Sequence, residues 1–341
     1  MLAPNGTVYV DNTTLRSVAE CDSEAALRHV LGYTVADDKF AMECGIAVHE
    51  VMADYFQGNP ASYCLQKFEL LYRGYSEDNG LDSSMHLSYR LSWTNTDKIL
   101  TEWFETHSLA SFNFSVNPKL VEVGFEIPLS DDCVCGWPAQ HVGRLGNCHE
   151  YRPAFVMWGR LDAIVQSQHD GAIYVLDHKT TGRLTPYWTE KFRNDSQMSG
   201  YVWAAQKTLG MPVVGVYINA IEFSKLPNDP VRKCREHGVV YAECGIHHMK
   251  SELLIYTRSP DQLDEWRRTA LTLAKRYRTL LQQVPDLNAV LTQTRMQGTF
   301  TGACGFCSFS KFCQAGRPVH YADAMLVHAP WRPYEKKEGA K

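Results

Sequence analysis

The stretch GRLDAIVQSQHDGAIYVLDHKT, residues 159–180, contains two strand-like runs separated by the dipeptide Asp170-Gly171. Asp-Gly between two such runs predicts a β-hairpin. With a two-residue turn, Asp162 lies opposite Lys179, whereas a four-residue loop places Asp162 opposite Asp177. Because strand side chains alternate between faces, Asp162, Asp177 and Lys179 project from one face in either register. The hairpin therefore predicts two carboxylates and a lysine close together on a sheet.

Two carboxylates this close repel each other unless a cation lies between them. Hard divalent ions such as Mg²⁺ prefer carboxylate oxygens, so the pair predicts a metal site. A protonated lysine cannot be a ligand, but it can orient a metal-bound water and stabilise charge on an attacked phosphate. The residues alone leave a second interpretation open, in which an exposed strand pair simply carries an Asp–Lys ion pair.

The periodicity of the remaining sequence indicates an α/β protein. Apolar residues at three-to-four spacing predict helices over 14–31, 42–57, 61–74, 95–107 and 187–209, and Ser259-Pro260-Asp261 opens a predicted helix to about residue 283. Alternating or continuous apolar runs predict strands over 120–127, 155–165, 172–176, 213–223 and 251–257. Residues 129–152 resemble an exposed insertion, and the polar residues after 317 predict a poorly ordered tail.

Composition narrows the class of protein. The 341 residues are 45% hydrophobic with a formal net charge of −4, which supports a packed core and excludes a coiled coil or a disordered chain. We expect an intracellular, cytoplasmic protein without membrane association, because we find neither an apolar span nor a signal peptide. The 11 cysteines are then expected to be thiols or metal ligands. The densest basic run, Arg267 to Arg278, could contact DNA or form an ordinary solvated helix face.

Gly-x2-Asp at residues 159–162 followed by Asp-x-Lys at 177–179 resembles the PD-(D/E)XK nuclease superfamily. Two further segments narrow the resemblance to RecB-like nucleases. Gln197 and Tyr201 match their Gln-x3-Tyr motif, and Gly45 with His49 matches their Gly-x3-His segment. Glu122 matches only loosely the acid that such nucleases carry on the strand before Asp162. The resemblance covers about residues 10–317.

This resemblance implies a restriction-endonuclease-like α/β (α+β) core, a mixed central sheet flanked by helices, with an N-terminal helical region. The expected divisions are a helical region at 1–115 that carries Cys21 and His49, the nuclease core at 116–258, a helix with a cysteine cluster at 259–317 and a tail at 318–341. The cluster is expected to close them into one structural unit. The implied ligands of Mg²⁺ or Mn²⁺ are His49, Asp162, Asp177 and the backbone carbonyl of His178. Lys179 would position the attacking water, and Gln197 and Tyr201 would bind DNA or position the lysine.

Cys304, Cys307 and Cys313 form a Cys-x2-Cys-x5-Cys cluster that needs a fourth ligand. In RecB-like nucleases of the AddB and CRISPR adaptation types, a single N-terminal cysteine supplies it, and Cys21 occupies the comparable place. The resemblance implies a 4Fe-4S cluster that joins the two chain ends. Spacing alone does not separate iron–sulfur from zinc.

The expected function is a metal-dependent DNA nuclease, an exonuclease on single-stranded DNA or duplex ends, without sequence specificity. Recombination, repair or phage DNA metabolism would be its setting, alone or with a helicase or recombination partner, and its oligomeric state stays open. One alternative is a catalytically silent, nuclease-like DNA-binding subunit, although such a subunit has no reason to retain both acids and the lysine. Another is a zinc-stabilised interaction domain, which explains the cysteines but not the acids.

Overall fold

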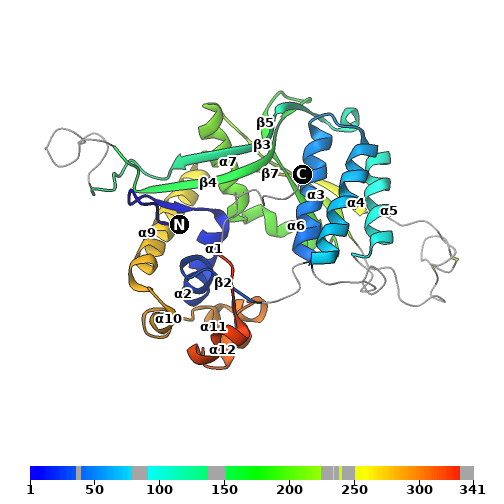
Figure 1. The fold of residues 1–341 in the computed structure, drawn as a ribbon. Helices are drawn as coiled ribbons and strands as arrows, with labels where there is room; N and C mark the ends of the chain where they lie inside the picture. The colour runs from blue at the N-terminus through cyan, green and yellow to red at the C-terminus, as the bar shows by residue number, and fades with distance from the viewer. Residues whose placement is uncertain are drawn as a thin grey trace. The chain divides into compact units, whose positions relative to one another are not determined.

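A computed structural model describes residues 1–35, 40–78, 91–136, 151–223, 233, 238–239 and 250–330. Its central sheet is mixed, with the order β1-β4-β5-β6-β7, and β3 also pairs with β4 (Figure 1). The strands are β1 (Val8–Val10), β3 (Phe114–Pro128), β4 (Phe155–Ser167), β5 (Ile173–Thr181), β6 (Gly215–Glu222) and β7 (Lys250–Thr257). Pairing is parallel for β1 with β4 and for β5 with β6, and antiparallel for β4 with β5 and for β6 with β7. Helices flank this sheet, so the predicted fold class is confirmed.

The chain divides into two compact units, each built from separate segments. The first contains residues 1–37, 124–159 and 260–341, and the second contains residues 38–123 and 160–259. Strands β3 and β4 contribute residues to both units. All of the residues predicted for the metal site belong to the second unit, and all four predicted cluster cysteines belong to the first.

In the second unit, helices α3 (Phe40–Phe56), α4 (Ala61–Asp78) and α5 (Trp93–Thr106) lie side by side (Figure 1). Apolar residues of α3 pack with residues of β4, β5 and β6 in one core, which excludes water from that face of the sheet. Strand β6 is buried along its whole length, as a central strand covered on both faces should be. At Gly215 an added Cβ would lie 2.2 Å from the Tyr256 carbonyl oxygen, so only glycine fits there.

The hairpin has the four-residue loop. Ala163 pairs with Leu176 and Gln166 with Ile173, a register that, continued by one residue, sets Asp162 opposite Asp177. Gly171 takes a φ of +71° in the loop, which glycine adopts without strain. The parity predicted from the sequence is therefore confirmed, with the longer of the two loops.

One helix predicted in the second unit is interrupted. The helix expected over 187–209 consists of α6 (Pro186–Glu190), the 3₁₀ turn η4 (Lys191–Asn194) and α7 (Ser196–Leu209). Asp195 is extended and its side chain accepts a hydrogen bond from the Gln197 backbone N–H, so it begins a new helix. The short 3₁₀ helix η2 (Leu109–Ser111) precedes β3.

In the first unit, the helix predicted over 14–31 is broken at Cys21. Its parts are α1 (Asn12–Glu20), α2 (Asp22–Ala25) and the π-helix η1 (Ala26–Val30). Cys21 itself is extended, with φ −163°, and its N–H still bonds the Ser17 carbonyl. Helix α9 (Pro260–Gln283) follows the prediction and buries residues at three-to-four spacing, among them Trp266, Ala270 and Tyr277.

The C-terminal part of this unit is built of short elements. They are α10 (Leu287–Gln293), α11 (Gly298–Thr301), η5 (Ala303–Phe306), α12 (Ser310–Gln314), η6 (Val319–Tyr321), α13 (Ala322–Met325) and β8 (Val327–His328). The prediction of a poorly ordered tail is wrong for 319–328, because β8 pairs with β2 (Tyr33–Thr34). The predicted insertion at 129–152 is described at its two ends only, and residues 331–341 lie outside the described part.

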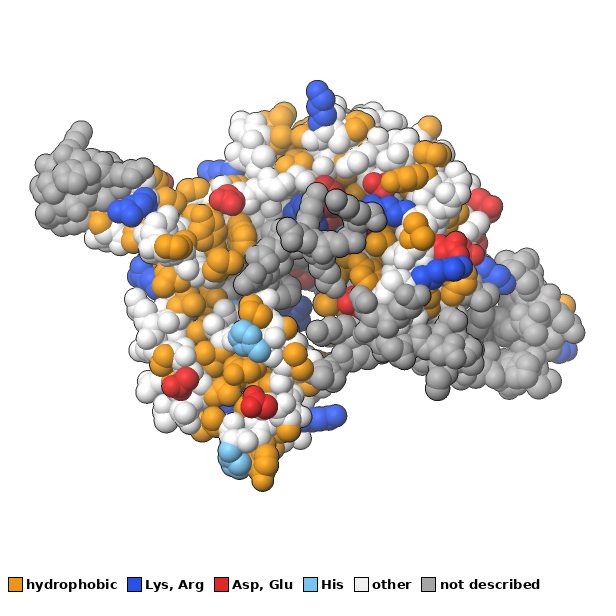
Figure 2. Space-filling view, in the orientation of Figure 1, with side chains coloured by type: hydrophobic (Ala, Val, Ile, Leu, Met, Phe, Trp, Pro, Cys, Tyr) orange, Lys and Arg blue, Asp and Glu red, His pale blue; other side chains and the backbone are white. Residues whose placement is uncertain are grey.

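Charged groups are mixed on the surface. On the face drawn in Figure 2, basic and acidic side chains are interspersed, and the described residues of that face gather into no broad basic patch. No helix among the described residues is long and apolar enough to cross a membrane.

Candidate active site

Asp162 lies on β4, directly beyond its paired segment with β5. Its Oδ2 accepts a hydrogen bond from the His178 backbone N–H at 2.8 Å and lies 3.0 Å from Nδ1 of His49 on α3. Burial raises the pKa of Asp162, but the charge and hydrogen bond of His49 outweigh it, so the pKa falls below its usual range. For His49, burial lowers the pKa and Asp162 raises it by more, so the pKa is raised overall. The two groups therefore form an ion pair at the predicted place.

Asp177 and Lys179 form a second pair on β5. Lys179 Nζ donates a hydrogen bond to Asp177 Oδ1 at 3.1 Å and lies 2.8 Å from Oδ2. The Asp177 side chain is only 1% exposed, and this burial raises its pKa to about 6 against the pull of Lys179, with the charge of Asp162 adding to the rise. Burial lowers the pKa of Lys179, but Asp177 and Asp162 raise it by more, so the amine stays protonated.

The side chain of His178 has a structural role. Because side chains alternate along β5, that of His178 lies on the face opposite Asp177 and Lys179. Its ring packs there against the ring of Phe56, with the centroids 5.2 Å apart. Asn219 Nδ2 on β6 donates to Nδ1 at 2.9 Å, and burial lowers the pKa of His178 to about 4. The imidazole is therefore neutral, and any role in metal binding falls to the backbone carbonyl, as the resemblance implies.

Gln197 and Tyr201 lie one turn apart on α7 and contact each other, with Gln197 Nε2 donating to the Tyr201 hydroxyl at 2.9 Å. The helix begins at Asp195, whose carboxylate contributes to the raised pKa of Lys179. The carboxylate at the start of α7 thus helps to keep Lys179 protonated. Sequence analysis missed Asp195, although its place before Ser-Gln-Met was a signal for a helix cap.

Glu122 on β3 is a further acid near the pairs. Its carboxylate lies 2.7 Å from Arg160 Nε, and burial raises its pKa, with the charge of Asp162 adding to the rise. Its backbone φ is +56°, a left-handed conformation that is rare outside glycine and is often found at functional sites. Glu122, the loosely matched acid, is thus a buried carboxylate whose pKa is affected by the charge of Asp162.

The donor chemistry of this site fits a divalent cation. Across the described residues, no three His, Cys, Asp or Glu side chains converge into a ready-made metal-binding group. Each acid is instead neutralised by a cation of the protein, Asp162 by His49 and Asp177 by Lys179. The buried Asp177 carboxylate is in contact with the Lys179 ammonium through both oxygens, so its negative charge is available at this place in the sheet. Two carboxylates, an imidazole and a carbonyl are ligands that Mg²⁺ and Mn²⁺ accept.

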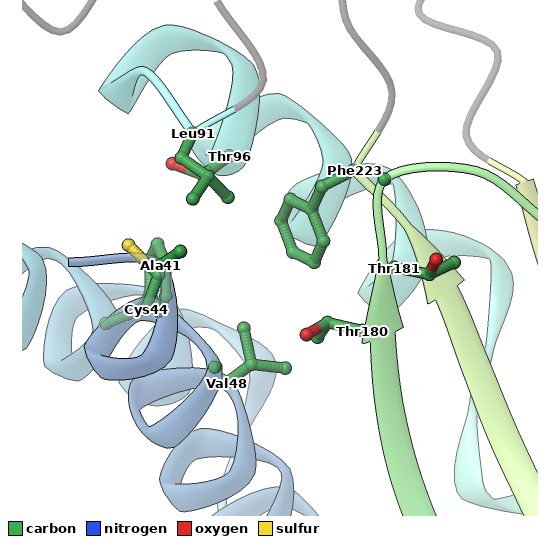
Figure 3. Close-up of a pocket in the computed structure, with 11 residues that line it drawn as sticks. Ala41, Cys44, Val48, Leu91, Thr96, Thr180, Thr181 and Phe223 are labelled. Carbon is green, nitrogen blue, oxygen red and sulfur yellow. The ribbon is translucent and has the colours of Figure 1, made fainter. Parts of the chain in front are cut away.

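A cavity of about 300 Å³ lies in the same unit (Figure 3). Cys44 and Val48 of α3, Thr180 of β5 and Phe223 line it, with Thr180 next to Lys179 in the chain. Thr180 points to the face opposite Lys179, so this cavity belongs to the apolar side of the sheet. It contains none of the predicted ligands.

A comparison with models of known families identifies the family of this chain. The model of a family described as the PD-(D/E)XK nuclease superfamily matches residues 12–314. The chain belongs to the PD-(D/E)XK nuclease superfamily. Members of this superfamily are nucleases that hydrolyse phosphodiesters and generally use Mg²⁺ or Mn²⁺.

Curated proteins and solved structures provide two further comparisons. No curated protein matches the sequence. A solved structure titled "Crystal structure of SSO0001" is similar at 16% identity over 63% of this chain and 67% of that one, with a TM-score of 0.27.

The four cysteines predicted to hold a cluster all belong to the first unit, and among the described residues they do not converge into a ready-made metal-binding group. Burial raises the pKa of Cys307 to about 11, with Cys313 and Cys21 among the groups that add to the rise. Burial also raises the pKa of Cys313, to which Cys21 and Cys304 contribute. Cys21, at the break between α1 and α2, thus contributes to the raised pKa values of cysteines 286 and 292 residues away in the chain. All eight cysteines among the described residues are free thiols.

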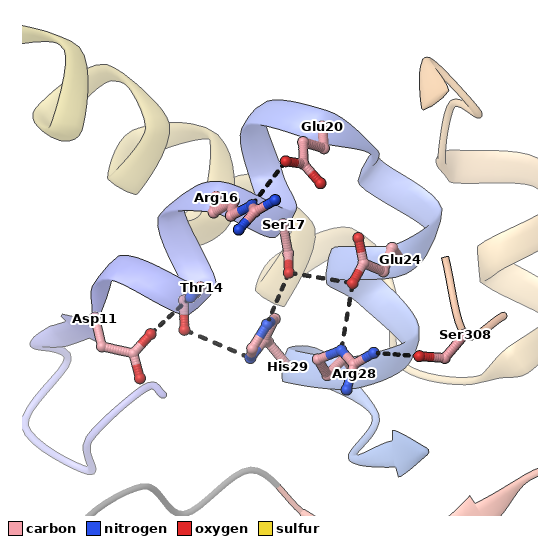
Figure 4. A network of polar contacts seen from close by, with 9 residues as sticks. All are labelled: Asp11, Thr14, Arg16, Ser17, Glu20, Glu24, Arg28, His29 and Ser308. Atoms are coloured by element: carbon pink, nitrogen blue, oxygen red, sulfur yellow. Dashed lines mark hydrogen bonds and ion pairs between the residues drawn. The ribbon is translucent and has the colours of Figure 1, made fainter. Parts of the chain in front are cut away.

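Thiolates are ligands that zinc and iron–sulfur clusters accept. Cys21 Sγ presently donates to the Arg295 carbonyl at 3.7 Å. The helices around Cys21 are fixed by a polar network, in which His29 contacts Thr14 and Ser17 (Figure 4). The break at Cys21 is thus held by a rigid frame on both sides.

Three arginines of the basic run have structural partners in the first unit. Arg276 forms an ion pair of 2.6 Å with the buried Asp22, and Arg267 donates to the Leu129 carbonyl at 3.2 Å. The Arg278 guanidinium lies 4.8 Å from the centroid of the Phe155 ring. Reversing these charges would disturb the fold of this unit, so a DNA-binding role for the run must be tested at Arg268 and Lys275.

Proposed function

We propose that the protein is a Mg²⁺- or Mn²⁺-dependent deoxyribonuclease of the RecB-like type, an exonuclease that degrades single-stranded DNA or duplex ends without sequence preference. The observation that carries this proposal is a set of two ion pairs on the adjoining strands β4 and β5 of a PD-(D/E)XK protein. Asp162 of β4 pairs with His49 of α3, and Asp177 of β5 pairs with Lys179 of the same strand. A surface strand pair does not explain it, because Asp177 is buried although its charge is costly there.

In this mechanism Asp162, Asp177, His49 and the His178 carbonyl would hold the cation, which when bound supplies a Lewis acid and an activated water. Lys179 keeps its proton and places a positive charge beside the attacked phosphate. Gln197 and Tyr201, joined by their hydrogen bond, would contact DNA or fix the position of Lys179 from α7. Cleavage would leave a 3′-hydroxyl and a 5′-phosphate.

The experiment that tests the substrate is cleavage of end-labelled linear single strands, linear duplexes and circular single strands, with Mg²⁺, Mn²⁺ or EDTA. An exonuclease releases short products from linear DNA and leaves the circle intact. Cleavage of the circle would replace the exonuclease assignment with an endonuclease one. Binding without cleavage of any substrate would favour the silent DNA-binding subunit, and the absence of both would leave the interaction domain.

We also propose that Cys21, Cys304, Cys307 and Cys313 hold a 4Fe-4S cluster, with zinc as the alternative metal. The family resemblance supports this proposal, as do the contributions of neighbouring cysteines to the raised pKa values of Cys307 and Cys313. Anaerobically purified protein should contain iron and acid-labile sulfide. A colourless protein with one tightly bound zinc would change the metal but retain the ligands.

The proposed setting is the reducing cytoplasm, where thiol ligands stay reduced. There the nuclease would serve recombination, repair or phage DNA metabolism, alone or beside a helicase or recombination partner.

A further inference from the structure

Tyr187 presents an aromatic ring to solvent at the edge of the second unit. It lies on α6, within the connection from β5, which carries Lys179, to α7, which carries Gln197. The residue is 88% exposed, so its ring contributes almost nothing to the core. A large exposed aromatic residue is informative when the backbone beneath it is rigid, because it then offers a preformed contact surface.

The backbone beneath Tyr187 is held at several points. The Thr185 side chain caps α6 by accepting from the Trp188 N–H at 3.1 Å, and Pro186 restricts the first turn. The Tyr256 hydroxyl of β7 donates to the Thr189 carbonyl at 2.7 Å. The short helix is therefore fixed to the sheet.

A second anchor follows one turn later. Trp188 packs edge-on against the buried Phe192, with ring centroids 4.8 Å apart. The buried Arg258 donates from Nη2 to the Phe192 carbonyl and from Nε to the Ser199 hydroxyl of α7, each at 2.9 Å. Arg258 thus fastens the whole connection to the helix that carries Gln197 and Tyr201.

Lys191 provides a positive charge in the same helical segment as the exposed ring of Tyr187. Lys191 lies four residues after Tyr187 in a nearly continuous helical segment, which places the two on the same side. The Nζ of Lys191 lies 4.7 Å from the ring centroids of both Trp188 and Phe192, so cation–π interactions with these two rings hold the ammonium in place. Exposed aromatic rings and basic side chains are the two kinds of contact that single-strand binding sites combine.

We propose that Tyr187 is a stacking platform for one base of single-stranded DNA, and that Lys191 contacts the phosphate beside that base. The proposal rests on the proposed function, since it gives the nuclease an unpaired strand as its substrate. Bases inside a duplex are stacked on both faces and cannot accept the ring, so the platform selects single strands or frayed ends. Tyr187 lies in the connection between the strand that carries Lys179 and the helix that carries Gln197 and Tyr201. A strand held at Tyr187 is therefore held on the segment that joins these proposed site residues.

The test measures binding in EDTA, where no metal-dependent cleavage occurs. A fluorescein-labelled oligo(dT) and the same strand with one 2-aminopurine are titrated with the full-length protein and its variants. Tyr187→Ala should weaken binding of the single strand by roughly 5- to 150-fold, which corresponds to the 1–3 kcal/mol of one base–aromatic stack. Tyr187→Phe should retain both the wild-type affinity and the quenching of 2-aminopurine fluorescence on binding, because the aromatic ring makes the stacking contact.

Lys191→Gln should weaken binding less and lower the salt dependence, by a slope of about 0.7 for one phosphate contact. The matched control is Phe300→Ala, which removes a ring that is 94% exposed in the first unit. Tyr187 is exposed, so its replacement should leave thermal unfolding unchanged.

Wild-type affinity and quenching in Tyr187→Ala would overturn the platform, as would an equal loss of single-strand and internal-duplex binding. Failure of the proposed nuclease function can be distinguished from failure of the stacking platform. If no preparation cleaves DNA but Tyr187→Ala still loses single-strand binding, the nuclease assignment fails and the platform stands.

Discussion

Asp177→Asn should stabilise the metal-free protein while removing its response to metal. In the free protein Asp177 is 1% exposed, and burial raises its pKa to about 6 from an ordinary value of 3.8. At about 1.4 kcal/mol per pKa unit, keeping this carboxylate ionised at neutral pH costs about 3 kcal/mol of folding free energy. Asparagine is an imperfect copy of the neutral acid, so we expect a gain of about 1–3 kcal/mol.

Asp162→Asn is the matched comparison, because its expected effect has the opposite sign. The Asp162 carboxylate pairs with His49 and accepts the His178 N–H, and its pKa is lowered. Loss of these charge-assisted contacts should cost about 2 kcal/mol. The two substitutions are chemically identical and differ only in the surroundings of the acid.

The assay is urea denaturation near pH 7, first in EDTA and then in Mg²⁺ or Mn²⁺. Wild type should gain stability with the cation, since only the folded state offers the ligands, and neither variant should gain as much. Destabilisation by Asp177→Asn in EDTA would refute the argument that burial makes this charge costly. An unchanged metal response in that variant would refute its role as a ligand.

Three further outcomes are expected. Burial, with the charges of Arg28 and the N-terminal amine adding, lowers the pKa of His29 to about 3, so its contribution to stability falls as the pH drops from 6.5 toward 3. In urea denaturation, the free energy of unfolding of wild type relative to His29→Gln should therefore fall by about 2 kcal/mol between pH 7 and pH 5. Only this difference isolates His29, because the pKa values of His178 and Asp177 are shifted as well. Gly215→Ala should destabilise by about 1–3 kcal/mol in the same assay, because its Cβ would meet the Tyr256 carbonyl, whereas at Gly124 an added Cβ meets nothing within 4 Å and Gly124→Ala should change little. Cys21→Ser should remove the bound iron measured by metal analysis, whereas replacement of the exposed Cys135 should not.

The sequence was enough to predict the hairpin and the grouping of its charged residues, because alternation along a strand holds for any even loop length. It did not fix the loop, since Asp170-Gly171 is compatible with both registers. The helix breaks at Cys21 and Asp195 were missed because apolar spacing continues across both. Asp195 caps α7 through its side chain, whereas Cys21 makes no side-chain cap hydrogen bond. Strand β1 has only three residues and pairs in parallel with a strand about 147 residues away, so no local pattern indicates it.

At the candidate site, residue types and order predicted which groups matter but not how they pair in the free protein. That His49 pairs with Asp162, that Asn219 holds the ring of His178 and that Glu122 has a left-handed backbone all depend on contacts between distant segments. The structural partners of Arg276 and Arg278 are likewise tertiary. A basic run that resembles a DNA-binding face in the sequence is in part a set of buried contacts.

The most direct test of the account is cleavage of an end-labelled single strand by wild type and by Lys179→Gln and Asp177→Asn, with Asp170→Asn from the loop of the same hairpin as control. We expect Mg²⁺- or Mn²⁺-dependent cleavage by wild type and control, none in EDTA, and a loss of at least ~10²-fold in the other two variants. DNA binding should be retained in Asp177→Asn, because a negative charge has been removed. Undiminished Mg²⁺-dependent cleavage by purified Asp177→Asn would contradict the account.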